Sequence, residues 1–197
     1  MRLLTILFAL FCLFGAAFGQ GTIQTLGGTG TCSYSGDGGQ ALQATLCNPQ
    51  STASDVTGNV YFVDSANWRI RQITPSGVIT TVAGNGVRGT SGDGGLAVSA
   101  SIGAVSQIAS DGSGHIVFND PDAHKIRYVS LSSGSIQGLG TGNAISAGDG
   151  LAWNAVSFNQ PSGIELFNQY QAPNVAQVSM LPMPLTTWSA AWTGSRE

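Results

Sequence analysis

Charged residues are scarce in this sequence, which limits the chemistry that it can support. Only 9% of the 197 residues are Asp, Glu, Lys or Arg, and the formal net charge is −3. Binding nucleic-acid phosphates at physiological salt needs several well-placed cations, so no nucleic-acid partner is expected. The sequence has two histidines, His115 and His124, and two histidines without a third ligand do not make a catalytic zinc site. We therefore expect no cofactor.

Long apolar runs are also missing, except at the N-terminus. Residues 3–14 are almost entirely apolar, follow one basic residue, and lead to small residues in Ala17-Phe18-Gly19. This pattern is typical of a secretory signal peptide, and the run is shorter than the roughly 20 residues that span a bilayer. We predict a signal peptide over residues 1–19, and a secreted or periplasmic protein without membrane contact after cleavage.

Cysteine is rare, and only Cys32 and Cys47 lie beyond the predicted signal peptide. In an oxidising compartment the two can form a disulfide. The alternative is a pair of buried free thiols. We expect the disulfide.

Glycine, by contrast, is abundant. Its 28 positions are about twice the average usage of roughly 7%, while 42% of the residues are hydrophobic. Glycine costs about 1 kcal/mol at an interior helix position, so a helical bundle is disfavoured. The composition predicts a turn-rich, all-β protein.

An internal repeat organises the chain. Ser35-Gly36-Asp37-Gly38-Gly39 recurs as Ser91-Gly92-Asp93-Gly94-Gly95, and in part as Ala147-Gly148-Asp149-Gly150, each time 56 residues later. The repeat units are therefore 35–90, 91–146 and a partial 147–167. Four strands per repeated unit are typical of a β-propeller blade.

Each full unit contains four runs rich in β-branched and aromatic residues, separated by turn signals. In the first unit these predicted strands are 50–54, 60–64, 69–74 and 78–82, and in the second 106–110, 115–119, 125–130 and 135–139. The stretches 40–46 and 96–102 are each long enough for about one helical turn. Residues 22–26 align with 78–82, which predicts the final strand of another blade.

The run Gly-Asn-Val-Tyr-Phe-Val-Asp-Ser-Ala-Asn-Trp-Arg-Ile-Arg-Gln-Ile, with Gly-Asp-Gly-Gly before it and Gly-Val-Ile-Thr-Thr-Val-Ala-Gly-Asn-Gly after it, resembles the NHL repeat. The resemblance covers residues 21–167 and is weaker in the second unit, where His124 replaces Trp68. It implies a β-propeller, commonly six-bladed, that usually serves as a binding platform. A minority of relatives, such as peptide-amidating lyases, carry a metal and catalysis. Those lyases use several histidines from different blades, which this sequence lacks.

The repeated charged residues have a structural and a functional interpretation. Asp64 and Asp120 end predicted strands, where a carboxylate can accept backbone N–H groups in a turn. Basic residues two positions apart share one face of a strand, where they either make salt bridges with neighbouring blades or form a cationic rim. These basic residues are Arg69, Arg71, Lys125 and Arg127.

The aspartates between glycines are weak candidates for calcium. Calcium takes six to eight oxygen ligands, whereas the loops of Asp37, Asp93 and Asp149 supply one carboxylate each. A turn-forming role is the favoured interpretation. We predict no catalytic residues, because neither a nucleophile with a positioned base nor a set of carboxylates stands out.

Residues 168–197 differ from the repeats. They hold three of the seven prolines and a single glycine, and we predict a divergent, disordered tail. The segment 20–167 is then an incomplete ring, a fragment of a larger propeller, since two full blades cannot close a ring.

The predicted function is that of a non-catalytic binding or scaffold module. Its ligand would be a protein or a carbohydrate, and it could self-associate through open blade faces. The alternative is a propeller lyase or hydrolase whose catalytic residues lie in blades that this sequence lacks.

Overall fold

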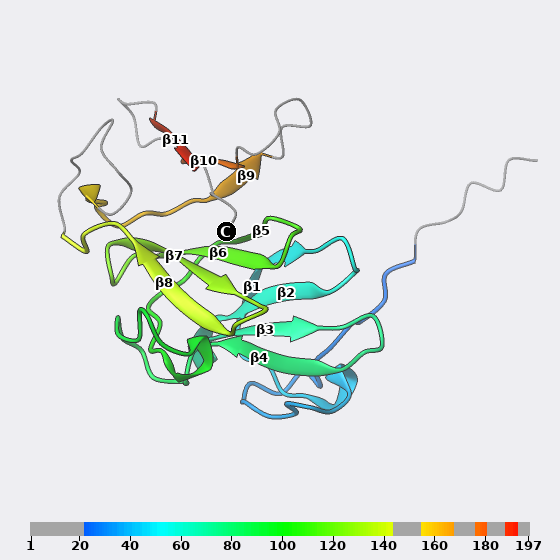
Figure 1. Cartoon of the computed structure of the whole chain (residues 1–197). Coiled ribbons are helices and arrows are strands. Elements are labelled where there is room, and N and C mark those ends of the chain that lie inside the picture. Colours follow the sequence, from blue (N-terminus) through cyan, green and yellow to red (C-terminus); the bar gives the residue numbers. More distant parts are fainter. Residues whose placement is uncertain (1–21, 144–154, 168–175, 181–187, 193–197) are drawn as a thin grey trace, which may run out of the picture.

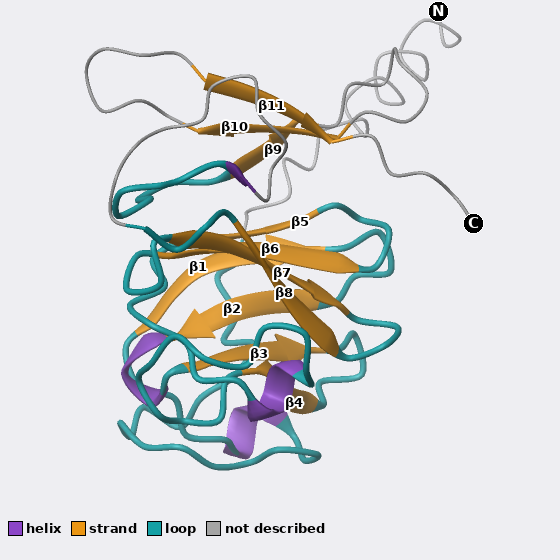
Figure 2. Cartoon of the chain, turned by 60° about the vertical axis from the view of Figure 1, so that its left-hand side comes forward, coloured by secondary structure: helices purple, strands orange, loops and turns teal. Residues whose placement is uncertain are grey.

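In the computed structural model the backbone is described for residues 22–143, 155–167, 176–180 and 188–192, and it forms three stacked antiparallel sheets (Figures 1 and 2). Three short 3₁₀ turns, η1 (Ala41–Gln43), η2 (Ser65–Asn67) and η3 (Ala97–Ser99), interrupt the loops. Among the described residues no helix is long and apolar enough to cross a membrane.

The first two sheets are four-stranded meanders whose strands follow the chain order. The first contains β1 (Pro49–Ser54), β2 (Val60–Asp64), β3 (Arg69–Ile73) and β4 (Ile79–Ala83), and the second contains β5 (Ile108–Ser110), β6 (His115–Asp120), β7 (Lys125–Ser130) and β8 (Ser135–Leu139). These bounds agree with the predicted strands to within one or two residues at most ends. The predicted all-β class with four-stranded blades is confirmed.

The two blades are packed face to face through one apolar core. Tyr61, Val63 and Ile70 of the first blade belong to the same buried cluster as Phe118 and Val129 of the second. The innermost strands β1 and β5 lie side by side, and the Ile108 N–H of β5 donates to Ser51 Oγ of β1 at 3.1 Å. Each blade therefore buries the apolar face of its neighbour, as expected of repeat proteins.

The other face of the first blade carries a smaller buried cluster. Phe62, Ile73 and Ile79 pack there against Ala41 and Ala44 around η1. In the repeat Phe62 corresponds to Phe118, yet no sheet covers the Phe62 face among the described residues. Residues of the connector around η1, and no sheet of the described part of the chain, therefore cover this face of the first blade.

Residues 22–26 do not form the predicted strand. They pair with no strand in the described part of the chain, and the side chains of Ile23 and Leu26 are exposed. A β-strand needs a neighbour to satisfy its backbone groups, and the sheet that this segment would complete does not lie beside it.

The third sheet lies in the C-terminal region. It contains β9 (Glu165–Phe167), β10 (Ala176–Met180) and β11 (Trp188–Trp192) in the order β11-β10-β9. Two segments of the region predicted as a divergent tail are therefore described as strands, β10 and β11. The prolines of this tail, Pro173, Pro182 and Pro184, fall outside the described residues, so β10 ends before the second of them.

We expect Gly84→Ala to destabilise the protein by about 3 kcal/mol or more, because a steric collision adds to the roughly 1–3 kcal/mol that a non-glycine residue costs in a left-handed conformation. Gly84 has φ +90° after β4, and an added Cβ would collide with backbone atoms of Trp68 and Arg69. Gly28 occupies the same repeat position with φ +94°, but its Cβ would meet only the flexible end of Leu46. Gly28→Ala should therefore cost less, and equal losses in urea denaturation would contradict this account.

Candidate interaction surface

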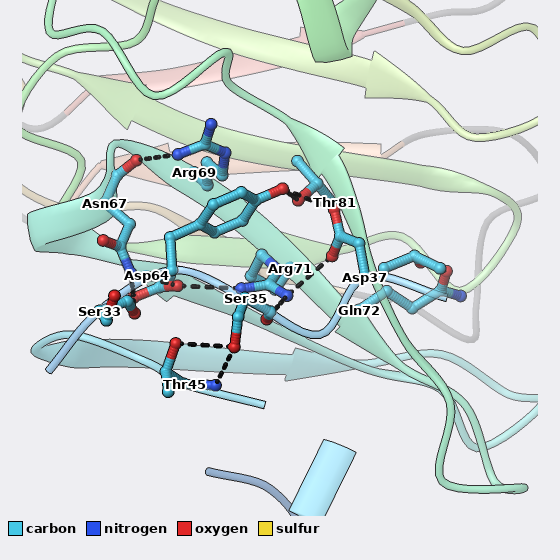
Figure 3. A network of polar contacts seen from close by, with 12 residues as sticks. Ser33, Ser35, Asp37, Thr45, Asp64, Asn67, Arg69, Arg71, Gln72 and Thr81 are labelled. Carbon is cyan, nitrogen blue, oxygen red and sulfur yellow. Dashed lines mark hydrogen bonds and ion pairs between the residues drawn. The ribbon is translucent and has the colours of Figure 1, made fainter. Parts of the chain in front are cut away.

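A buried arginine ties the glycine-rich connector of the first blade to its sheet (Figure 3). Arg71 on β3 is fully buried, and its Nη2 lies 2.7 Å from Asp37 Oδ1 in the connector. Its Nη1 lies 3.2 Å from Asp64 Oδ2 at the end of β2, and Nη2 also donates to the Ser35 carbonyl at 3.1 Å. One guanidinium therefore holds three segments together.

The second blade repeats this cluster. Arg127 is fully buried, with Nη1 at 3.1 Å from Asp120 Oδ2 and Nη2 at 2.8 Å from Asp93 Oδ1. It also donates to the carbonyls of Ser91 and Ser101 at 2.9 and 2.8 Å. Arg71 and Arg127 therefore lie inside the fold and form salt bridges, rather than lining a rim.

Asp64 and Asp120 close the turns that follow β2 and β6. Asp64 Oδ1 accepts the Cys47 N–H at 2.8 Å, and Asp120 Oδ2 accepts the Gly103 N–H at 3.3 Å. Burial raises the pKa of Asp120, although the hydrogen bonds from Gly103 and Arg127 oppose that rise. Both aspartates thus hold the chain that enters their own blade.

The calcium candidates Asp37 and Asp93 face cationic side chains of the chain itself. Asp37 accepts from Tyr34 Oη at 2.7 Å as well as from Arg71, and Asp93 accepts from Lys125 Nζ at 2.9 Å as well as from Arg127. Burial works against the charge of Asp37, but hydrogen bonds from Thr81 and Tyr34, with Arg71, keep its pKa lowered. Within the described part of the chain no three His, Cys, Asp or Glu residues group as metal ligands. Asp149 lies outside the described residues.

The predicted disulfide is confirmed, since Cys32 and Cys47 are bonded to each other. It links the start of the connector to the residue that donates to Asp64, so it holds the same junction as the Arg71 cluster.

His115 is the first residue of β6, whereas His124 lies in the turn directly before β7, and the two form no common site. His115 Nδ1 is 2.7 Å from Asp111 Oδ2, while His124 Nδ1 accepts the Gln160 N–H at 3.3 Å. Each histidine therefore has its own local structural partner.

The turn between β1 and β2 should make the protein sensitive to acid. Burial opposes ionisation of Asp55, but hydrogen bonds from Asn59, Thr57 and Tyr61 keep its pKa well below the usual range. Burial and the bond to Asp55 in turn raise the pKa of Tyr61 to about 12. A carboxylate with a lowered folded-state pKa stabilises the fold above its unfolded pKa of about 3.9, and this stability is lost as the pH falls below that value.

We therefore expect the melting temperature to drop between about pH 4 and pH 2, as this contribution is lost. Asp55→Asn should melt lower at pH 7 and show a shallower acid slope. Circular dichroism melts from pH 7 to pH 2 measure both, and an unchanged slope in the variant would argue against the role of Asp55.

A cluster of arginines and aromatic rings lies at the connector end of the two blades. Arg69 Cζ is 3.6 Å from the centroid of the Tyr34 ring, and Arg88 Cζ is 5.3 Å from that of Trp68. Arg88 also reaches the second blade, with Nε 2.7 Å from Asp122 Oδ2. We call Tyr34, Trp68, Arg69 and Arg88 the Arg–aromatic surface.

This surface combines rigidity with access to solvent. Arg69 is fixed by donating to the carbonyls of Asn67 and Asn85 at 3.0 and 2.9 Å. Tyr34 is 38% exposed, and the Arg88 side chain is 58% exposed. Arginine, tyrosine and tryptophan are the residues most enriched among binding hot spots.

Sequence analysis identified only Arg69 of this surface as a candidate. The signal for the others is the failure of the repeat, because Thr90 replaces Tyr34, His124 replaces Trp68 and Ala144 replaces Arg88 one unit later. Residues required by every blade should recur, whereas residues of a single binding site need not.

A hollow of about 480 Å³ opens on the face of the first blade that no other described sheet covers. Residues 24–27 form one side of it, and Leu46, Pro49, Phe62 and Ile73 contribute to the rest. The corresponding face of the second blade packs against the first blade. The hollow therefore occupies the position where a preceding blade would pack against the first.

Repeated four-stranded meanders packed face to face, with their innermost strands side by side, define the class of this protein as a β-propeller. Residues 27–91 match the family model of the Teneurin NHL domain. This match supports the resemblance to NHL repeats in the first repeat unit.

Curated relatives match only a short stretch. The chain is 44% identical over 50 residues to mouse Teneurin-3 and 44% identical over 59 residues to chicken Teneurin-1. These matches cover 25% and 29% of this chain, and 2% of each relative. The chain therefore spans only a small part of the length of these relatives.

Solved structures overlap with larger parts of the chain. A protein of unknown function from Bacteroides thetaiotaomicron is 26% identical, with a TM-score of 0.45 over 52% of this chain and 26% of the other. A streptogramin B lyase is 18% identical, with a TM-score of 0.39 over 72% of this chain and 39% of the other.

Proposed function

We propose that this chain is an exported, non-catalytic NHL propeller module that binds a protein partner through its Arg–aromatic surface. The observation that supports this most is that the repeated and the unrepeated polar and aromatic residues have different environments. The repeated residues Arg71 and Arg127 bind repeated aspartates inside each blade. Tyr34 and Arg88 are not repeated and reach solvent, and Trp68, also not repeated, lies partly buried beneath Arg88.

The chemistry of this surface suits a protein partner. Arg88 is held over an aromatic ring and against Asp122, so little side-chain entropy would be lost when a partner covers it. The backbone beneath is fixed as well, because Trp68 and Arg69 lie against Gly84 and Asn85 of the connector. A rigid aromatic and guanidinium surface is typical of an interface hot spot.

Export is supported by the Cys32–Cys47 bond, since disulfides persist in oxidising compartments. The predicted signal peptide lies outside the described residues. Expression of the whole chain in a secreting host, followed by N-terminal sequencing of the medium, tests the prediction. A mature protein that starts at Gln20 is the expected result. A chain that stays in the cell with residues 1–19 still attached would contradict the prediction.

The binding proposal can be tested with the mature chain as a probe. Residues 20–197, biotinylated, are applied to singly arrayed, purified secreted and cell-surface proteins of its own organism. We expect a saturable partner whose affinity falls about 30-fold in Trp68→Ala and in Arg88→Ala, the loss of a 2 kcal/mol hot spot.

Val56→Ser is the matched control, because Val56 is 85% exposed in the turn between β1 and β2, at the opposite end of the strands. It should bind like the unmodified chain. A partner that tolerates both surface substitutions would contradict the proposed site, and turnover of a lyase or hydrolase substrate would favour an enzyme instead.

A further inference from the structure

Residues 22–26 have the sequence of the fourth strand of a blade but belong to no described sheet. The repeat aligns Ile23 with Ile79, the first residue of β4, and Thr25 with Thr81. β4 is hydrogen-bonded to β3 as the fourth strand of its sheet, whereas residues 22–26 pair with no described strand. Ile23 is fully exposed and Leu26 is 60% exposed, so an apolar strand sequence is left in solvent.

The third sheet, by contrast, lacks a fourth strand among the described residues. β9, β10 and β11 correspond to the first three strands of a blade, because their order repeats that of β1, β2 and β3. The second and third strands pair over five consecutive residues in both sheets, which allows them to be superimposed at their ends. Ala176 pairs with Trp192 and Met180 with Trp188, just as Val60 pairs with Ile73 and Asp64 with Arg69. Among the described residues no strand lies on the far edge of β11, where the counterpart of β4 belongs.

These two features are separated by the whole stack of sheets. Residues 22–26 lie beside the first blade, and β11 lies beyond the second (Figure 1). Propellers close with four to eight blades, so three sheets do not bring the segment and the edge of the same copy together. Two copies with three sheets each supply six blades, which is within the range that closes.

We propose that two copies of this chain associate head to tail into one ring, with residues 22–26 of each copy adding as the fourth strand beside β11 of the other. Interfaces of this head-to-tail kind form closed rings when the rotation allows it. The hollow beside Phe62 and Ile73 would be covered in the same step, because that face of the first blade then meets the third sheet of the second copy.

Superimposing β10 and β11 on β2 and β3 at their paired ends also predicts the register of the exchanged strand. β3 pairs Ile73 with Ile79 and Arg71 with Thr81. Transferred to the third sheet, Ile23 of one copy lies opposite Trp192 of the other, and Thr25 lies opposite Ala190.

The mass of the mature chain in solution tests the association. Sedimentation equilibrium of residues 20–197 should give twice the mass of one chain, and Ile23→Asp should give a single chain. Ile23 makes no packing contact in one copy, so the variant should keep its circular dichroism spectrum. Val56→Asp, at another largely exposed apolar position outside the proposed interface, should remain a dimer. A monomeric unmodified chain, or a dimeric Ile23→Asp variant, would overturn the proposal.

Cysteine cross-linking tests the register. With the native disulfide retained, Thr25→Cys combined with Ala190→Cys should yield a covalent dimer under mild oxidation, seen on a non-reducing gel. Gln24→Cys with Ala190→Cys is displaced by one residue, which places the two side chains on opposite faces, and should not cross-link. Equal cross-linking of the two pairs, or none in the first, would overturn the proposed strand addition.

Discussion

Arg127→Met is expected to lower the free energy of unfolding by about 3–5 kcal/mol, the usual cost of removing one partner of a buried ion pair. The guanidinium is fully buried and is bound by Asp120, Asp93 and two backbone carbonyls. Methionine fills most of the volume but leaves Asp120 buried with no counter-charge. Urea denaturation followed by circular dichroism measures the loss.

Lys125→Met is the matched control for this substitution. Lys125 lies two residues away on β7 and binds the same Asp93, but its side chain is 24% exposed. A solvent-accessible pair contributes about 1 kcal/mol or less, so the control should remain near the unmodified protein. Similar losses in both variants would show that the Arg127 cluster is not a special source of stability.

Removing the disulfide is the second large effect. The Cys32–Cys47 bond closes a loop with a sequence separation of 15, and a loop of that size contributes about 3 kcal/mol in the chain-entropy model. We expect the double variant Cys32→Ser and Cys47→Ser to lose about that much, measured by the denaturant midpoint at a constant slope.

Reductant supplies the control for the disulfide. It should shift the midpoint of the unmodified protein to that of the double variant and leave the double variant unchanged. An unmodified protein whose midpoint does not respond to full reduction would contradict a stabilising role of the bond.

The repeat made the blades predictable from sequence. Two aligned copies of one 56-residue unit identify the strands by agreement, so β2 and β6, or β3 and β7, support each other where one copy alone would be ambiguous. The disulfide was predictable too, since beyond the predicted signal peptide only Cys32 and Cys47 remain.

The position of a side chain within the ring was harder to predict. Alternation places Arg69 and Arg71 on one face of β3, but it does not say that the connector covers Arg71 and leaves Arg69 to stack on Tyr34. That difference depends on Asp37 and Tyr34, which lie more than thirty residues earlier in the chain.

The same limit explains why residues 22–26 do not form the predicted strand and why β10 and β11 were not predicted as strands. Residues 22–26 have the composition of a strand, but a strand forms only where a sheet edge is available. β10 and β11 lie in a region whose prolines hide the repeat, so sequence alignment could not find them.

The buried ion clusters affect how such a protein can grow in evolution. Every member of the first cluster, Asp37, Asp64 and Arg71, lies within residues 35–90, and every member of the second, Asp93, Asp120 and Arg127, lies within residues 91–146. Duplication or deletion of a whole unit therefore never separates a buried arginine from its carboxylates. The number of blades can therefore change by gene duplication without leaving an unpaired buried charge. Selection can then act on the number of blades in the ring.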